Sequence, residues 1–353
     1  MTDTRKKERL LYIEVLRVLA MTAVVVIHVT AINFYSTDKL AFQTWIIHII
    51  FNCLARWAVP VFVMVSGAIF LDPERPLRTR KLFSKYIPRL LVMYLLWSAL
   101  YLFIDIALYK KNMSAGVLIN TWISGHYHLW YLPMCISLYL VTPVVRKIVI
   151  DKKVVQYFLI LAFVVTFAVP TVLEFLKLID GRLFDIGSLF AKQFQIYLPI
   201  GYISYFVLGN FINKSLIERK TEYQIYLLGA GGFIYTVLMT VIASKKLNDY
   251  TGFLSNTSVN VLFESIAVFV FAKKHLNTIG NGSIEKMVRY LAKYSFGVYL
   301  IHAFIVDLIK NFANDILVFY PVVSVPITVI TVVVLSLACT VVLHKIPFVN
   351  RFL

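Results

Sequence analysis

Charged residues are scarce in this sequence. Of its 353 residues only 15% are Asp, Glu, Lys or Arg, whereas soluble globular domains carry about 25%. Apolar residues make up 60%, and the mean hydropathy is +0.79. Several charge-free windows reach the roughly 20 residues that a helix needs to cross a bilayer core of about 30 Å. The composition therefore excludes a single soluble domain and predicts several membrane-spanning helices.

Cysteine is also rare, and no metal-binding spacing is present. Cys53, Cys135 and Cys339 lie in separate apolar runs without a Cys-x-x-Cys pair, which predicts buried, unreactive thiols. His126 and His128 are two residues apart, so their side chains would point apart on a helix, and no third ligand is evident. We therefore expect no metal.

The apolar runs predict about ten spans within one domain, residues 1–353. The spans are 12–33, 43–71, 86–109, 128–150, 154–176, 193–213, 222–244, 252–272, 290–309 and 321–344. Pro60, Pro133 and Pro143 make the second and fourth spans irregular, because proline removes a backbone donor. Such breaks persist only where other helices or a wet cavity satisfy the carbonyls. The predicted fold is an all-α polytopic transmembrane bundle.

Basic residues set the predicted orientation. The net charge of +17 does not indicate nucleic acid, because the basic residues lie in short loops rather than on one soluble domain. The loops on the side of both chain ends carry 22 Lys and Arg, against nine on the other side. Positive loops stay inside, so both termini are predicted to be cytoplasmic. The longest outer stretches, 110–127 and 177–192, are candidate rims or lids.

Ionisable residues inside apolar spans are candidate site residues, because an unpaired charge is costly in a bilayer. Arg17 and His28 in the first span are eleven residues apart, which places them on one helix face about 16 Å apart along the axis. Glu14 lies one turn closer to the cytoplasm. This pattern places an anion-binding charge at the inner mouth and an imidazole deep on the same face. The alternative is a snorkelling arginine and a histidine bonded between helices.

The second span carries Arg56 at a depth near that of His28, and later the pair Ser66-Gly67. In the alternative interpretation, Arg56 only pairs with a buried carboxylate, and the Ser66-Gly67 pair only allows close helix packing. The carboxylates considered are Asp105, Asp307 and Glu264.

Two further groups of residues suit a ligand. His128, Trp130 and Tyr131 begin the fourth span, and an imidazole beside aromatic faces suits a sugar ring. The same aromatic residues are typical of an ordinary membrane interface. In the ninth span His302 falls at mid-membrane, one turn from Tyr299, where a hydrogen-bonded core histidine is the alternative.

Together these segments resemble membrane-bound acyltransferase family 3, the polytopic O-acyltransferases of bacterial envelopes. The resemblance covers nearly the whole chain and is sharpest over 12–28, 59–67, 128–143 and 295–302. The spacing of Arg17 and His28 is its most specific feature. Many members carry an Arg-x-x-Arg motif before the third span, whereas this chain has Arg78-Thr79-Arg80-Lys81 there.

The resemblance implies an enzyme of the bacterial cytoplasmic membrane that transfers an acyl group, here acetyl, from acyl-CoA to a hydroxyl of an envelope glycan or glycolipid. His28 would be the catalytic base, with Glu14 orienting it. Arg17 would hold the CoA phosphates with a basic group, namely Arg78, Arg80, Lys81, Lys85 and Arg89. Candidate substrate-binding residues are Arg56, Ser66, His128, Trp130, Tyr131, Tyr299 and His302. Membrane lipid is the remaining expected partner.

Two other functions fit the same residues. Interrupted spans with charges at mid-depth are also typical of carriers, here for a lipid-linked sugar or a small polar metabolite. A membrane anchor or assembly subunit of a polysaccharide synthase would use the buried charges structurally.

Overall fold

The computed structural model describes residues 3–34, 40–75, 77–109, 114–193, 200–248, 251–277 and 282–347. Every regular element within these ranges is a helix, so the predicted all-α fold is confirmed. Nine helical stretches there are long and apolar enough to cross a membrane, as expected of a multi-pass membrane protein. Large apolar side chains stay exposed along α8, α12 and α16, where lipid would cover them.

The helices follow one another with short connections. The first half contains α1 (Asp3–Phe34), α2 (Phe42–Leu54), α3 (Ala58–Phe70), α4 (Thr79–Lys81), the π-helix η1 (Leu82–Tyr86), α5 (Ile87–Tyr109), α6 (Ala115–Ser124) and α7 (Tyr131–Ile148). A bent span of α8 (Lys152–Ala162), the π-helix η2 (Phe163–Ala168) and α9 (Val169–Ile179) comes next, then α10 (Gly181–Gln193) and α11 (Gly201–Lys214). The chain ends with α12 (Arg219–Leu247), the 3₁₀ turn η3 (Gly252–Leu254), α13 (Val259–His275), α14 (Ser283–Phe312), α15 (Asp315–Val318) and α16 (Pro321–Leu343).

The predicted spans and the observed helices differ in two places. The sixth predicted span, 193–213, includes residues 194–199, which lie outside the described residues, and its described part is the 14-residue α11. The predicted outer loops 110–127 and 177–192 contain helices, α6 and α10. Leu183, Ile186 and Leu189 of α10 recur with helical spacing, a signal that the prediction of an outer stretch did not use.

The second span is interrupted, as predicted, but not at the proline. Residues 55–57 form a turn between α2 and α3. Pro60 lies in the first turn of α3, where its missing N–H leaves no hydrogen bond unmade. The turn places Arg56 inside the bundle, where its guanidinium donates a hydrogen bond to the side-chain oxygen of Asn52.

Helices α3 and α11 cross in direct backbone contact. A Cβ atom on Gly67 would overlap the carbonyl of Phe206, and one on Gly209 would overlap the carbonyl of Met64. Phe206 and Met64 are fully buried in the same core cluster. Gly67 therefore allows close helix packing, which was the alternative interpretation of the Ser66-Gly67 pair.

Replacing Gly67 by alanine should lower the melting temperature of the purified protein. Added methyl groups in a packed core cost about 1–3 kcal/mol, and a rigid backbone carbonyl cannot move away as a side chain would. Gly231→Ala on α12 is the matched control, because nothing lies within 4 Å of its added Cβ. Equal melting temperatures for the two variants would contradict this account of the crossing.

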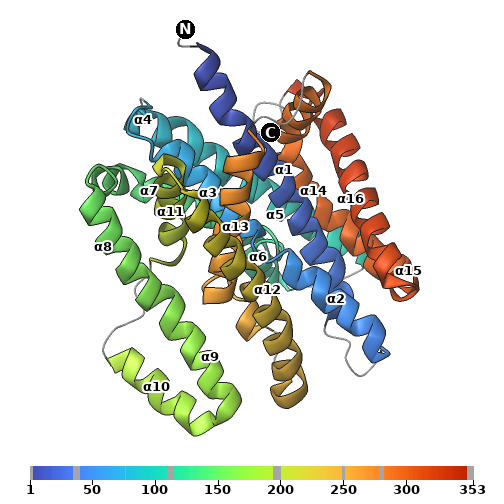
Figure 1. The fold of residues 1–353 in the computed structure, drawn as a ribbon. Coiled ribbons are helices and arrows are strands. Elements are labelled where there is room, and N and C mark those ends of the chain that lie inside the picture. The colour runs from blue at the N-terminus through green and yellow to red at the C-terminus, as the bar shows by residue number, and fades with distance from the viewer. Residues whose placement is uncertain are drawn as a thin grey trace.

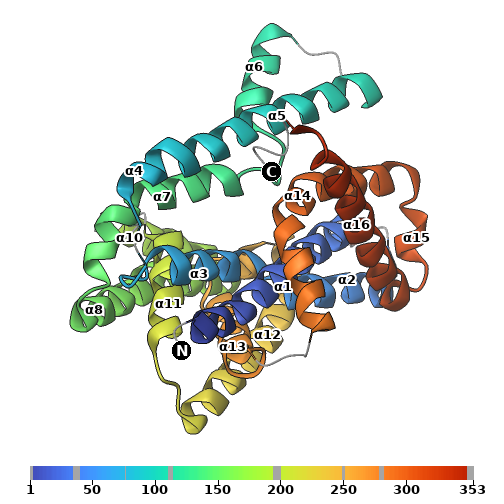
Figure 2. The same ribbon diagram turned by 90° about the horizontal axis from the view of Figure 1, so that it is seen from above.

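The two ends of the described chain lie at the same end of the bundle. Figure 1 shows the first turns of α1 and the last turns of α16 at the top, with α10 at the opposite end. Figure 2, seen from above, shows α5 and α7 side by side, set apart from the group that contains α1, α3 and α14. Residues of both groups line one cavity, which is described in the next section.

The predicted orientation can be tested with a reporter enzyme that is active only outside the cytoplasm. Fused after Val117, within α6, the reporter should be active, because the basic loops retain the opposite side in the cytoplasm. Fused after Arg78, just before α4, it should be silent. The reverse pattern would place the basic cluster outside and remove it from cytoplasmic CoA.

Candidate active site

A cavity of about 450 Å³ lies between the pair α5 and α7 and the helices α1, α3 and α14. Eight of the candidate residues line it, namely Arg17, His28, Ser66, Arg89, His128, Trp130, Tyr131 and Tyr299. These residues are far apart in the sequence and come from all five helices or the turns before them. The volume falls in the range of about 300–1,000 Å³ that is usual for small-molecule sites.

Arg17 and His28 face this cavity together, so the prediction that they share one helix face is confirmed. Both are half-buried, as expected of side chains that meet a cavity rather than the packed core. A terminal nitrogen of Arg17 donates a hydrogen bond to Ser295 Oγ at 3.2 Å. Because Ser295 belongs to α14, this bond helps to fix the guanidinium at the cavity wall.

One end of the cavity is cationic. Arg17 of α1, Arg89 of α5 and Lys293 of α14 all line it, beside Tyr86 and Phe296. The Arg89 guanidinium lies 5.9 Å from the centre of the Phe296 ring. Tyr86 belongs to the π-helix η1 and Arg89 follows it, so the local change of helical pitch sets how both enter the wall. Three cations from three helices can bind a polyanion such as a phosphorylated ligand.

The other end of the cavity is a cluster of imidazoles. The His28 ring centre lies 5.2 Å from that of His302, and His302 lies 5.2 Å from His128. His302 is fully buried behind this wall, and its Nδ1 lies 2.6 Å from the carbonyl of Tyr299. Of the three histidines, His28 and His128 line the cavity. A reacting group in the cavity could therefore meet His28 or His128, with His302 as their support.

His126 and His128 do not point apart, contrary to the sequence prediction. Residues 127–130 form a turn instead of a helix, and the Nδ1 atoms of the two histidines lie 2.9 Å apart. The other nitrogen of His126 lies 3.2 Å from a carboxylate oxygen of Asp307. Asp307, His126 and His128 thus form a bonded chain that ends at the cavity and orients the His128 ring.

Glu14 is not positioned to orient His28. Its carboxylate forms an ion pair of 2.8 Å with Arg289, which also binds Glu285 at 2.8 Å. Fourteen residues of continuous helix separate it from His28, about 21 Å along the axis. The predicted catalytic role of Glu14 is therefore not supported, and its ion pair joins α1 to α14.

Arg56 lies outside this cavity, in a second one described below. Its guanidinium donates a hydrogen bond to the side-chain oxygen of Asn52. Ser66 donates a hydrogen bond to the carbonyl of Phe62 and lines the main cavity, whereas its neighbour Gly67 packs against α11.

The remaining basic candidates are spread along one approach. Four of them precede Arg89, on or beside α4 and η1, and all four are exposed: Arg78, Arg80, Lys81 and Lys85. Lys81 Nζ lies 5.6 Å from the ring centre of Tyr86, which lines the cavity. These residues can attract an anion toward the cavity, but of the five only Arg89 is part of its wall.

Sequence reasoning missed several wall residues, namely Lys293, Tyr86, Cys135, Tyr139 and Phe296. Lys293 carried a usable signal, because it is an ionisable residue inside the predicted span 290–309. The aromatic residues had none, since membrane helices carry many. Cys53 and Cys135 are buried as predicted, but Cys339 is exposed on α16.

The model of the acyltransferase domain of family 3 matches residues 10–345. The chain belongs to this family. Its cavity residues all fall inside the matched range, so the protein is a multi-pass membrane acyltransferase, and the resemblance seen in the sequence is confirmed at the level of the family. No curated protein and no solved structure matched the chain.

An acyltransferase needs an acyl donor and an acceptor. The cavity of this acyltransferase offers a cationic end, a histidine end and aromatic side chains between them, including Tyr131 and Tyr139. Within the described part of the chain, no group of three or more His, Cys, Asp or Glu side chains is arranged to hold a metal ion.

Proposed function

We propose that this acyltransferase transfers an acetyl group from cytoplasmic acyl-CoA to a hydroxyl of an envelope glycan or glycolipid. The observation that supports this most is one cavity with Arg17, Arg89 and Lys293 at one end and His28 at the other. Arg17 and His28 are about 16 Å apart along the α1 axis, which suits a donor with phosphates at one end and a thioester on a long arm.

The cationic end would bind the phosphates of CoA by charge-assisted hydrogen bonds. The exposed basic residues before Arg89 would attract the same phosphates from the cytoplasm. The pantetheine arm would then extend along the aromatic wall that includes Tyr86, Tyr139 and Phe296. In this arrangement the thioester carbonyl would lie next to His28.

His28 would act as a general base. It takes the proton of the acceptor hydroxyl while the hydroxyl oxygen attacks the thioester carbonyl carbon. The tetrahedral intermediate collapses, the carbon–sulfur bond breaks, and the CoA thiolate leaves and takes the proton back from the imidazolium. The products are the acetyl ester and CoA, with no net proton change. Tyr131, which lines the cavity, would donate a hydrogen bond to the oxyanion.

The acceptor is proposed from the resemblance seen in the sequence. Within the family the chain looks most like the O-acetyltransferase of enterobacterial common antigen, which implies a polysaccharide of the cell envelope and the bacterial inner membrane. Trp130 and Tyr131 follow His128 in the wall of the cavity and suit a sugar ring by stacking.

Mass spectrometry of envelope glycans from cells with and without the gene tests this proposal. We expect a mass increase of one acetyl group per modified sugar that depends on the gene and disappears after mild base, which cleaves esters and spares amides. Purified protein should transfer labelled acetyl from acetyl-CoA to the same glycan fraction. Identical glycans from both strains, together with no transfer by the purified protein, would reject the proposal.

A further inference from the structure

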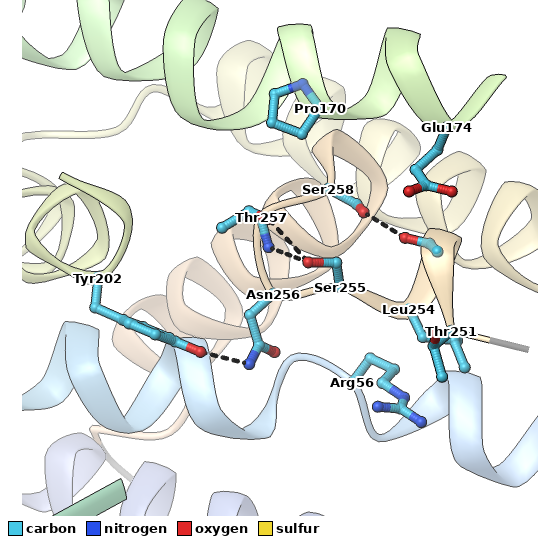
Figure 3. A pocket seen from close by; sticks show the side chains of 11 residues that line it. Arg56, Pro170, Glu174, Tyr202, Thr251, Leu254, Ser255, Asn256, Thr257 and Ser258 are labelled. Carbon is cyan, nitrogen blue, oxygen red and sulfur yellow. Dashed lines mark hydrogen bonds between the residues drawn. The ribbon is translucent and has the colours of Figure 1, made fainter. Parts of the chain in front are cut away.

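A second cavity, of about 520 Å³, lies outside the site described above. Its wall combines the α2–α3 turn with α9, the start of α11 and the segment 251–258 before α13. Figure 3 shows Glu174 of α9 at the upper right and Arg56 below it, with Tyr202 and Asn256 on the left. Hydroxyl groups of the segment, such as those of Ser255 and Thr257, complete the lining.

The wall of this second cavity is held in place by hydrogen bonds. The side-chain amide of Asn256 donates to the hydroxyl of Tyr202 at 3.0 Å, and the hydroxyl of buried Tyr205 donates to the Asn256 carbonyl at 2.7 Å. At Gly252 an added Cβ atom would collide with the carboxylate of Glu174 and displace that side chain. The polar groups are therefore preorganised, as a binding site requires.

The second cavity adjoins the first. The ring of Tyr202, in its wall, lies 5.7 Å from the ring of Trp130, in the wall of the first cavity. On the other side Arg56 binds Asn52, whose amide donates to the carbonyl of Ile27, the residue before His28, at 3.1 Å. A ligand in the second cavity would thus be one aromatic pair away from the histidine end.

The charges of the second cavity favour an uncharged ligand. Its wall holds one cation, Arg56, and one carboxylate, Glu174, which lies 4.0 Å from Lys177 Nζ. The first cavity gathers three cations, whereas this one has no cation cluster to select an anion. A carboxylate, an amide, a phenol and several hydroxyls in one wall match the alternating donors and acceptors of a sugar ring. The ring of Tyr202 in this wall offers an apolar face for the C–H groups of the sugar.

We propose that this second cavity binds an uncharged sugar unit of the acceptor, next to the unit whose hydroxyl is acetylated at His28. This rests on the proposed function, because it assigns the acceptor site of the same enzyme. Glu174 and Asn256 bind sugar hydroxyls, and Tyr202 positions Asn256. The cavity then selects the acceptor, while the first cavity selects the donor.

Saturation-transfer NMR on the full-length protein in lipid nanodiscs tests this directly, without any need for turnover. The probes are uncharged hexoses and N-acetylhexosamines, as mono- and disaccharides, with glucuronate as the charged comparison. At least one uncharged sugar should bind, and its affinity should fall about tenfold or more in Glu174→Gln and Tyr202→Phe, because each loses a hydrogen bond to or within the site. Asp185→Asn, on exposed α10, is the matched control and should bind as the unchanged protein does.

Acetyl-CoA binding separates a failure of this inference from a failure of the proposed function. Glu174→Gln and Tyr202→Phe should bind acetyl-CoA normally, which also reports that they are folded. Three results would overturn the assignment of the cavity. No sugar of the panel binds, Glu174→Gln binds sugar as well as Asp185→Asn does, or glucuronate binds more strongly than the uncharged sugars. If the unchanged protein does not bind acetyl-CoA, the proposed donor is rejected. The sugar-binding result would still test the assignment of the second cavity.

Discussion

Replacing His28 by alanine should abolish detectable acyl transfer, while the protein still inserts, purifies as one species and binds acyl-CoA. Loss of a general base typically costs about 10²–10⁴-fold in rate. An imidazole has a pKa of about 6.5 in water, so a histidine can accept a hydroxyl proton at neutral pH. The effect should appear in kcat rather than in donor affinity, because the phosphate-binding residues lie at the other end of the cavity.

His302→Ala is the control for this experiment, since His302 is fully buried behind His28 and is not part of the cavity wall. It should retain much more activity than His28→Ala. A dead but folded His302 variant beside an active His28 variant would move the base to α14. Near-normal turnover in both would reject base catalysis by these histidines and favour a carrier of lipid-linked sugars or polar metabolites.

Replacing Arg17 by alanine should weaken acyl-CoA binding about ten- to a hundredfold. A charge-assisted hydrogen bond to a phosphate is worth about 1.5–3 kcal/mol, and Arg17 supplies its guanidinium from a half-buried position at the cationic end. Isothermal titration with acetyl-CoA and with dephospho-CoA measures the loss and shows whether the 3′-phosphate is the group that Arg17 binds.

Arg17→Lys should restore part of the affinity, because lysine keeps the charge but cannot donate two parallel hydrogen bonds to one phosphate. Ser295→Ala is the companion variant, since Ser295 accepts a hydrogen bond from Arg17 at 3.2 Å and should only loosen its position. Unchanged binding of acetyl-CoA by folded Arg17→Ala protein would remove Arg17 from the donor site. A similar loss in Lys293→Ala would confirm the role of the lysine that sequence reasoning missed.

Much of the site could be predicted because it depends on helical geometry within one span. The shared face of Arg17 and His28 follows from 3.6 residues per turn along an unbroken helix, and α1 is unbroken over that stretch. The role predicted for Glu14 is not supported, because helical geometry within one span says nothing about partners on other helices. Its position on the helix was foreseeable, but its partner Arg289 is 275 residues away in the sequence, and no local rule indicates that pair.

The histidine pair His126 and His128 shows where the helical rule misleads. Their spacing predicts divergent side chains only if the segment is helical, and here it is a turn that joins them to Asp307 of α14. Arg56 shows a related limit. The helical rise predicts its depth but does not state which side of the α2–α3 turn the side chain faces, and it faces a different cavity.

The sequence by itself determined that this protein is a helical membrane protein, because a bilayer demands long apolar runs with internally satisfied backbones, and these can be read residue by residue. It also determined the family, with Arg17 and His28 on one face. Only the tertiary structure decided that α5 and α7 stand apart from α1, α3 and α14 to leave a cavity. It also decided that Lys293 joins the cationic end and that Arg56 lines a second cavity. Packing between helices depends on contacts between side chains far apart in the chain, and the hydrophobicity of each span does not encode which face meets which neighbour.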